Sequence, residues 1–120
     1  MKVTEIAFTA YPVTDLARAR AFYEGVLGLT PSPTTSPQWM EYYIGEHTLG
    51  IGSAPGWEPN PNGGCVGLEV EDFDAAIAEL KAAGVPFRFG PMPTPVCQMA
   101  GISDPDGNSL IIHKRNPGHH

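Results

Sequence analysis

Basic residues, cysteines and long apolar runs are all scarce in this sequence. Its 7 Lys and Arg face 13 Asp and Glu, the formal net charge is -6, and Lys114-Arg115 is the only adjacent basic pair. Proteins that bind nucleic acid need clustered positive charge to meet the phosphates, so we expect no nucleic-acid partner. No stretch approaches the roughly 20 apolar residues of a membrane-spanning helix, so we expect no membrane partner either.

The beginning of the chain, MKVTEIAFTAYPVTD, lacks the apolar core of a secretory signal peptide. We therefore expect a cytoplasmic protein. Its 2 cysteines, Cys65 and Cys97, are then expected to be reduced thiols, because disulfides are rare in that compartment. His119 and His120 follow Asn116-Pro117-Gly118 and are interpreted as a possible tag remnant, so they carry no functional argument.

Glycine and proline are abundant, with 14 and 13 among 120 residues, and 42% of the residues are hydrophobic. This composition excludes a disordered chain and a long helical bundle. It favours one compact domain of short elements joined by turns.

The chain contains two stretches with the same order of predicted elements. Asp72 before the second predicted helix lies 57 positions after Asp15 before the first, which indicates an internal duplication. The first stretch predicts a strand over 3–13, strands over 39–44 and 47–52, and a connector over 53–64. Between the first two strands it predicts an amphipathic helix over 16–27, which Thr14 or Asp15 can cap and which Gly25 and Gly28 end. The second predicts a strand over 65–71, a helix over 73–83, strands over 85–89, 96–102 and 109–114, and a proline-rich loop over 90–95.

Five short motifs occur in order along the chain. They are PVTDL at 12–16, ARAFY at 19–23, GVLGL at 25–29, VED at 70–72 and DPDGN at 104–108. Together they resemble the vicinal oxygen chelate superfamily, which includes glyoxalase I, bleomycin-resistance proteins and extradiol dioxygenases. The resemblance implies an α+β fold of two βαβββ modules, over 1–56 and 57–118, in a single domain. It also implies a cup-shaped mixed β-sheet with helices on the convex side, and a homodimer.

In metal-using members, the resemblance implies one divalent ion held by His, Gln or Glu on the first strand and Glu on the last strand of each module. Phe, Gly and Ile side chains cannot ligate a metal, and one cysteine does not make a site. We therefore predict no metal ion and no cofactor. The corresponding positions here are Phe8, Gly50, Cys65 and Ile111.

Strand alternation predicts which side chains of the second module face the cup. If Cys65 and Ile111 point inward, Glu69 and His113 do so too. A carboxylate beside an imidazole can perform acid–base chemistry, so Glu69 and His113 are the candidate catalytic residues. The alternative is that both lie near the rim, solvated or hydrogen-bonded. A displaced metal site with Cys65 is disfavoured, because an extended strand puts Cys65 and Glu69 about 13 Å apart.

Aromatic side chains in the first module and connector can stack flat ligands or fill a core. One of Tyr42 and Tyr43 must lie on each face of its strand, Gly50 leaves room in the floor of the cup, and Trp57 is an anchor or a lid. The full predicted ligand-binding set is Phe8, Trp39, Tyr43, Gly50, Trp57, Cys65, Glu69, Ile111 and His113.

Three functions remain open at this point. The first is a metal-independent small-molecule-binding protein with an apolar, aromatic-lined cup, whose acidic charge favours cationic ligands. The second is a lyase or isomerase of the lactoylglutathione lyase type. The third is a dimeric interaction protein without a small ligand.

Overall fold

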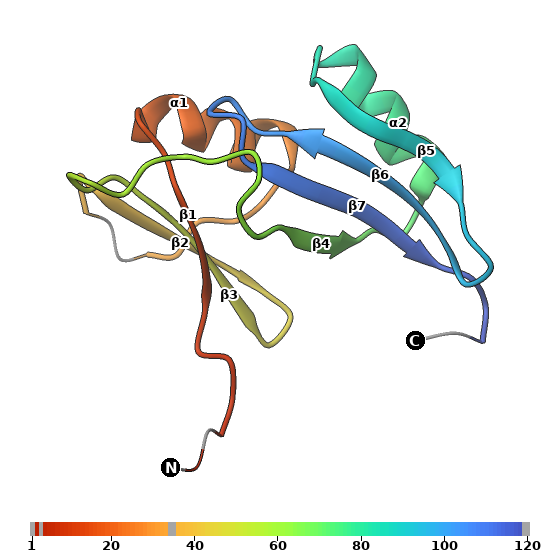
Figure 1. Ribbon diagram of the computed structural model, residues 1–120, viewed down its shortest axis with the longest axis horizontal. Helices are drawn as coiled ribbons and strands as arrows, with labels where there is room; N and C mark the ends of the chain where they lie inside the picture. Colours follow the sequence, from red (N-terminus) through yellow and green to blue (C-terminus); the bar gives the residue numbers. More distant parts are fainter. Residues whose placement is uncertain (1, 3, 34–35, 119–120) are drawn as a thin grey trace. The chain divides into compact units, whose positions relative to one another are not determined.

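The computed structural model describes residues 2, 4–33 and 36–118. The predicted tag residues His119 and His120 therefore lie outside the described residues. The chain divides into two compact units, Met1–Pro59 and Asn60–His120 (Figure 1). Each unit has its own mixed sheet and its own helical segment, and the fold is α+β with curled sheets, as the resemblance implies.

The first unit is built on a sheet in the order β1-β3-β2, in which β1 is parallel to β3 and β2 is antiparallel to it. The side chain of Asp15 caps the helical segment by accepting a hydrogen bond from the backbone N–H of Arg18 at 3.1 Å. The elements are β1 (Thr9–Pro12), α1 (Leu16–Arg20), the π-helix η1 (Ala21–Val26), β2 (Trp39–Ile44) and β3 (His47–Gly52).

The core of the first unit lies between the helical segment and one face of this sheet. Tyr23 of η1 stacks on Tyr42 of β2 with ring centroids 6.1 Å apart, and both side chains are fully buried. Alternate residues of β2 and β3 complete this face, namely Met40, Leu49 and Ile51. The opposite face of the sheet, which we call the open face, therefore carries the residues between them.

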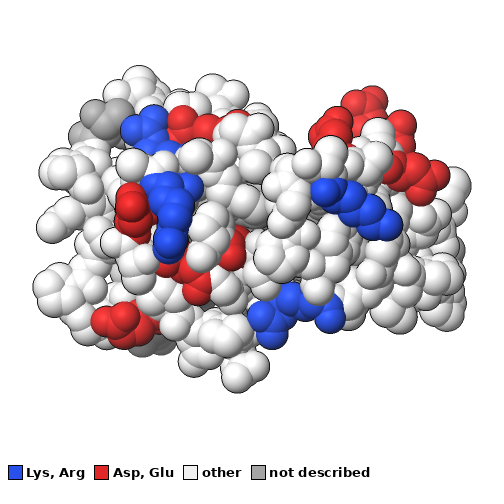
Figure 2. Space-filling view, turned by 90° about the horizontal axis from the view of Figure 1, so that it is seen from above, with Lys and Arg blue, Asp and Glu red and all other residues white. Residues whose placement is uncertain are grey.

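The second unit is built on a sheet in the order β4-β7-β6-β5, with β4 parallel to β7 and the other pairs antiparallel. Its core joins Phe73, Ile77 and Leu80 of α2 to Leu110 and Ile112 of β7, all of which are buried. Acidic side chains gather on the outer side of α2, as Figure 2 shows. The elements are β4 (Val66–Glu69), α2 (Phe73–Ala82), β5 (Phe87–Pro93), β6 (Cys97–Ser103) and β7 (Ser109–Arg115).

The strand predicted over 3–13 is shorter than expected, because only Thr9–Pro12 is paired. A strand needs a neighbouring backbone to pair with. The neighbour β3 begins at His47, directly after the turn at Gly45-Glu46, so it offers little beyond Thr9. Residues 4–8 are not assigned to a strand.

The helix predicted over 16–27 changes from α-helix to π-helix at Ala21. Beyond that point the backbone N–H of Leu27 reaches the carbonyl of Phe22, five residues back, at 3.0 Å, which is the π-helical spacing. Among the described residues, the sheet of the first unit has three strands where that of the second has four. In place of a fourth strand it has an isolated antiparallel β-bridge between Pro31 and Tyr42, beside which the Ser32 N–H donates to the Glu41 carbonyl at 2.9 Å.

The prediction of a loop over 90–95 was wrong in part, because β5 continues to Pro93. Proline lacks a backbone N–H and is tolerated in a strand only at a sheet edge or a bulge. β5 is such an edge strand, and its register with β6 shifts between Phe87 and Phe89 and again before Met92.

No helix within the described residues has the length and apolar character needed to cross a membrane.

Candidate functional site

Three aromatic side chains meet on the open face of the first unit. The rings of Phe8 and Trp39 are in an edge-to-face arrangement with centroids 6.0 Å apart, and Trp39 stacks on Trp57 at 6.4 Å with an interplanar angle of 23°. Phe8 is 55% exposed and Trp57 is 36% exposed. We call Phe8, Trp39 and Trp57 the aromatic cluster. Exposed apolar surface of this kind is characteristic of binding sites.

Glycines beneath Trp39 determine where its indole lies. A Cβ atom at Gly50 or at Gly52 would overlap the Trp39 ring, so the indole lies flat over the backbone of β3. The room predicted above Gly50 is therefore occupied by Trp39 itself. Phe8, Trp39, Gly50 and Trp57, all predicted for the binding set, are brought together.

Tyr42 and Tyr43 lie on opposite faces of β2. Tyr42 is fully buried on the helix side, whereas Tyr43 is 60% exposed on the open face. Tyr43 pairs with Thr48, and Trp39 pairs with Gly52 at the other end of the same two strands. Tyr43 thus shares the open face with the aromatic cluster but is not part of its ring contacts.

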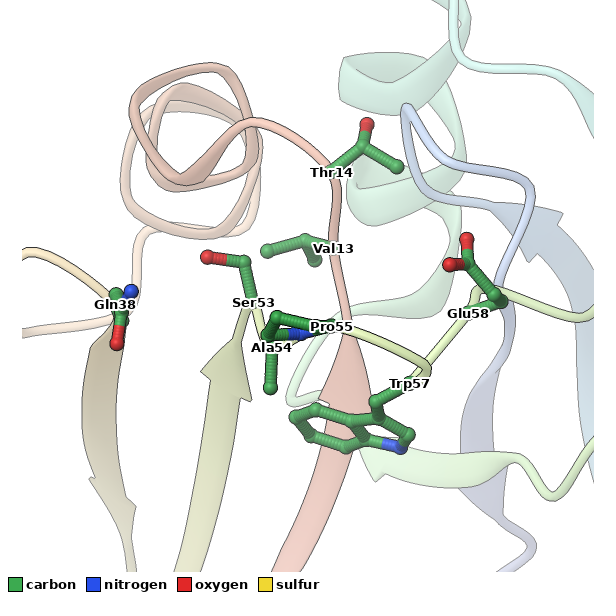
Figure 3. Close-up of a pocket in the computed structure, with 8 residues that line it drawn as sticks. All are labelled: Val13, Thr14, Gln38, Ser53, Ala54, Pro55, Trp57 and Glu58. Atoms are coloured by element: carbon green, nitrogen blue, oxygen red, sulfur yellow. The ribbon is translucent and has the colours of Figure 1, made fainter.

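A small pocket adjoins the aromatic cluster at Trp57 (Figure 3). Its volume is about 260 Å³. Of its lining residues only Trp57 was predicted for the binding set, because the others are scattered over the segment between β1 and α1, the residue before β2 and the connector. The lining residues are Val13, Thr14, Gln38, Ser53, Ala54, Pro55, Trp57 and Glu58.

The face of the second sheet that lies opposite α2 and the buried Leu110 and Ile112 holds the predicted acid–base residues. Glu69 of β4 and His113 of β7 are register partners, and Glu69 Oε1 lies 2.6 Å from His113 Nδ1. The backbone N–H of Arg115 donates to Glu69 Oε2 at 2.8 Å. Ile111 lies two residues before His113 and is half-buried, while Cys65 is exposed just before β4.

The electrostatics of this pair favour an ionised carboxylate. Partial burial raises the pKa of Glu69, but the hydrogen bonds from the Arg115 backbone and from His113, with the positive charge of Arg115, outweigh it, so the pKa of Glu69 is lowered. A carboxylate that accepts from Nδ1 holds the imidazole in the tautomer whose Nε2 can accept a proton. The arrangement is chemically able to act as a general base.

The residues at the expected ligand positions do not fit a metal ion. Phe8 packs against Trp39, Gly50 lies under the same indole, and Ile111 offers only carbon atoms. Cys65 is the single donor among the four positions. Within the described residues, no group of three or more His, Cys, Asp or Glu side chains is placed to hold a metal.

A family model and several solved structures match this chain. The model of the Glyoxalase/Bleomycin resistance protein/Dioxygenase superfamily matches residues 5–112. The chain belongs to this superfamily. A comparison with curated protein sequences gave no match.

Solved structures agree with this membership. TnmS3, an antibiotic binding protein from Streptomyces sp. CB03234, is 27% identical with a TM-score of 0.78, over 97% of this chain and 99% of that protein. A lactoylglutathione lyase from Agrobacterium tumefaciens is 21% identical with a TM-score of 0.75, over 94% and 95% of the two chains. A glyoxalase/dioxygenase from Nostoc punctiforme is 20% identical with a TM-score of 0.79, over 93% and 91%. The last two similarities show the fold alone.

Proposed function

We propose that this superfamily member is a metal-independent small-molecule-binding protein of the bleomycin-resistance kind, and that it binds flat aromatic ligands on the aromatic cluster. The observation that carries the proposal is the stacked pair of Trp39 and Trp57, with Phe8 against its edge, on an exposed sheet face. The similarity to an antibiotic binding protein over nearly the whole chain supports it.

The energetics of stacking are adequate for such a role. An aromatic pair contributes about 0.5–1.5 kcal/mol beyond the area it buries, and the burial itself adds about 25 cal/mol per Å² of apolar surface. Gly50 and Gly52 hold the Trp39 indole flat, so little rotamer entropy remains to be lost on binding.

The test is isothermal titration of the protein with naphthylmethanol, a flat neutral probe. Trp57→Ala removes one stacking surface and is expected to weaken binding roughly tenfold. Val96→Ala, which truncates another exposed apolar side chain, is the matched control and should bind as the unaltered protein does. Equal loss in both variants, or no heat of binding in the unaltered protein, would contradict the proposal.

A lyase or isomerase of the lactoylglutathione lyase type is the second candidate, favoured by the contact between Glu69 and His113. In this function His113 Nε2 removes a proton from the substrate, and Glu69 positions the ring. The assay is the formation of S-lactoylglutathione as a function of pH. His113→Asn should abolish turnover, and Glu69→Gln should lower it and alter the pH profile. Absence of turnover in the unaltered protein would eliminate this candidate.

We further propose that residues 1–118 act as one domain, as a homodimer, in the cytoplasm. The family model spans both units, which supports the single domain. The exposed Ile6 supports a self-association surface, and the free thiols of Cys65 and Cys97 suit a reducing compartment.

A role in interaction through the dimer without any small ligand is the third candidate. It would be favoured if no flat ligand raised the melting temperature.

A further inference from the structure

A row of side chains crosses the sheet of the second unit on the face opposite α2. Register places His113 of β7 beside Glu69 of β4 on one side and beside Met99 of β6 on the other. Met99 in turn lies opposite Met92 of the edge strand β5. Directly opposite residues of an antiparallel pair share a face, with Cβ atoms about 4.5–5.5 Å apart. Two thioethers and an imidazole thus occupy neighbouring positions, and we call Met92, Met99 and His113 the donor row.

A bulge in β5 puts Met92 in this row. Phe89 pairs with Gly101, and regular pairing from that point would put Pro91 opposite Met99. The register instead shifts between Phe89 and Met92, so that Met92 takes this position. Bulges are frequent beside functional sites, where they redirect a side chain. The edge strand therefore adds a second sulfur that regular pairing would not supply.

The donor row is accessible from solution and has apolar surface along one side. Met92 is 44% exposed, and the His113 side chain is 29% exposed. A Cβ atom at Gly101 would overlap the Phe89 ring, so this ring lies over Gly101. Gly101 is two residues from Met99 in the same strand and therefore on the same face. The ring thus borders the two methionines with carbon atoms.

Glu69 prepares the imidazole to act as a ligand. Glu69 Oε1 lies 2.6 Å from His113 Nδ1, and a carboxylate that accepts from Nδ1 leaves the lone pair on Nε2. Histidines that bind metals almost always donate their other ring N–H in this way, which raises the basicity of the ligating nitrogen. Arg115 Nη1 lies 3.7 Å from the same carboxylate oxygen, so the positive charge nearest to the row is offset by Glu69.

We propose that the donor row binds a soft monovalent metal ion, Cu(I), through the two methionine sulfurs and His113 Nε2. Thioether sulfur is a soft donor that selects Cu(I), whereas Zn²⁺ is held by thiolate, imidazole and carboxylate groups. The site lies apart from the four ligand positions that the family resemblance implies. The inference goes beyond the proposed function and shares no residue with the aromatic cluster, so each can be tested without the other.

The experiment titrates the protein with Ag(I), a redox-inert substitute for Cu(I), and follows the isotope-labelled methionine methyl groups by nuclear magnetic resonance. Cys65→Ser is the starting protein, because the exposed thiol of Cys65 would also bind silver. One equivalent of Ag(I) is expected to shift the methyl signals of Met92 and Met99. The signal of Met40, which is buried in the first unit, should stay where it is.

A histidine variant tests the third donor. His113→Asn in the same protein is expected to weaken Ag(I) binding roughly tenfold. His47→Asn, at an exposed position of β3, is the matched control and should leave the affinity unchanged. Silver binding without a shift of both methionine signals, equal affinities of the two histidine variants, or no silver binding at all would overturn the metal site. None of these results would affect the binding of naphthylmethanol, which tests the proposed function.

Discussion

At the scale of single residues, the aromatic cluster depends on two positions without side chains. The Trp39 indole lies directly over Gly50 and Gly52, and a Cβ atom at either position would displace it. The glycine requirement arises from a close approach of side chain to backbone, because neither residue has a positive φ angle. Small residues on β3 and a large one on β2 thus form one structural unit.

Gly50→Ala is expected to force the Trp39 ring off the sheet. The free energy of unfolding should fall by about 1–3 kcal/mol, as for other overpacked sites, and tryptophan emission should shift because the stack with Trp57 is broken. Gly67→Ala is the matched control, since nothing lies within 4 Å of its added Cβ on strand β4. Urea unfolding followed by fluorescence measures both quantities. Identical stability and emission in the two variants would contradict the packing described for Trp39.

At the scale of elements, Glu24 of η1 contacts both Arg20 of α1 and Tyr42 of β2. We call these three residues the charged triad. Arg20 Nε lies 2.5 Å from Glu24 Oε2, and the Tyr42 hydroxyl donates to the same oxygen at 2.9 Å. The hydrogen bond from Arg20 lowers the pKa of Glu24; burial opposes this shift, and the bond from Tyr42 reinforces it. Burial, with the bond to Glu24, raises the pKa of Tyr42, which therefore stays protonated as a donor.

This triad predicts that part of the free energy of unfolding is lost at acidic pH. Because the pKa of Glu24 is lower in the folded than in the unfolded chain, its contribution is complete above the unfolded value, about 4.3. It is lost as the pH falls through the folded pKa. Glu24→Gln should therefore flatten the decline of the melting temperature in this acidic range. Glu79→Gln, on the exposed side of α2, is the control. Parallel pH curves for Glu24→Gln and the unaltered protein would contradict the prediction.

The N-terminus of α2 offers a second prediction about an element. Asp72 Oδ1 accepts a hydrogen bond from the backbone N–H of Ala75 at 3.0 Å. Asp72→Ala should lower the free energy of unfolding by about 1 kcal/mol. Asp74→Ala, in the same first turn, removes a charge that favours the helix dipole and should cost less. Urea unfolding gives both values. An equal or larger cost at Asp74 would mean that charge, and not capping, stabilises this turn.

At the scale of the whole molecule, self-association is the property to measure. The side chain of Ile6, outside the aromatic cluster, is 80% exposed and is the apolar group proposed for the self-association surface. Light scattering after size exclusion should give twice the chain mass of 12.8 kDa. Dilution should reduce that mass by mass action. A mass of one chain at every concentration would contradict the homodimer.

Much of the architecture was predictable because it rests on local signals. Periodic apolar positions, with Thr14 or Asp15 as the first predicted cap and Asp72 as the second, located both helical segments, and alternation separated Tyr42 from Tyr43 by face. The β5 extension was missed because proline signals a loop unless the strand lies at a sheet edge, and edge position is not written in the local sequence. Likewise, nothing local indicated that the helix would widen into η1 at Ala21.

The sequence alone showed that basic residues are scarce and that three of the four expected metal-ligand positions lack a donor atom. Charge and donor atoms are properties of residue types, so they do not depend on the fold. Strand alternation, counted from the positions that the resemblance assigns to Cys65 and Ile111, predicted that Glu69 and His113 share a face, and their side chains are in contact. The aromatic cluster and the pocket with Glu58 arise only in the folded chain. Their members come from strands and a connector that backbone hydrogen bonds bring together, and the indole of Trp39 fills the space that was predicted to be open above Gly50.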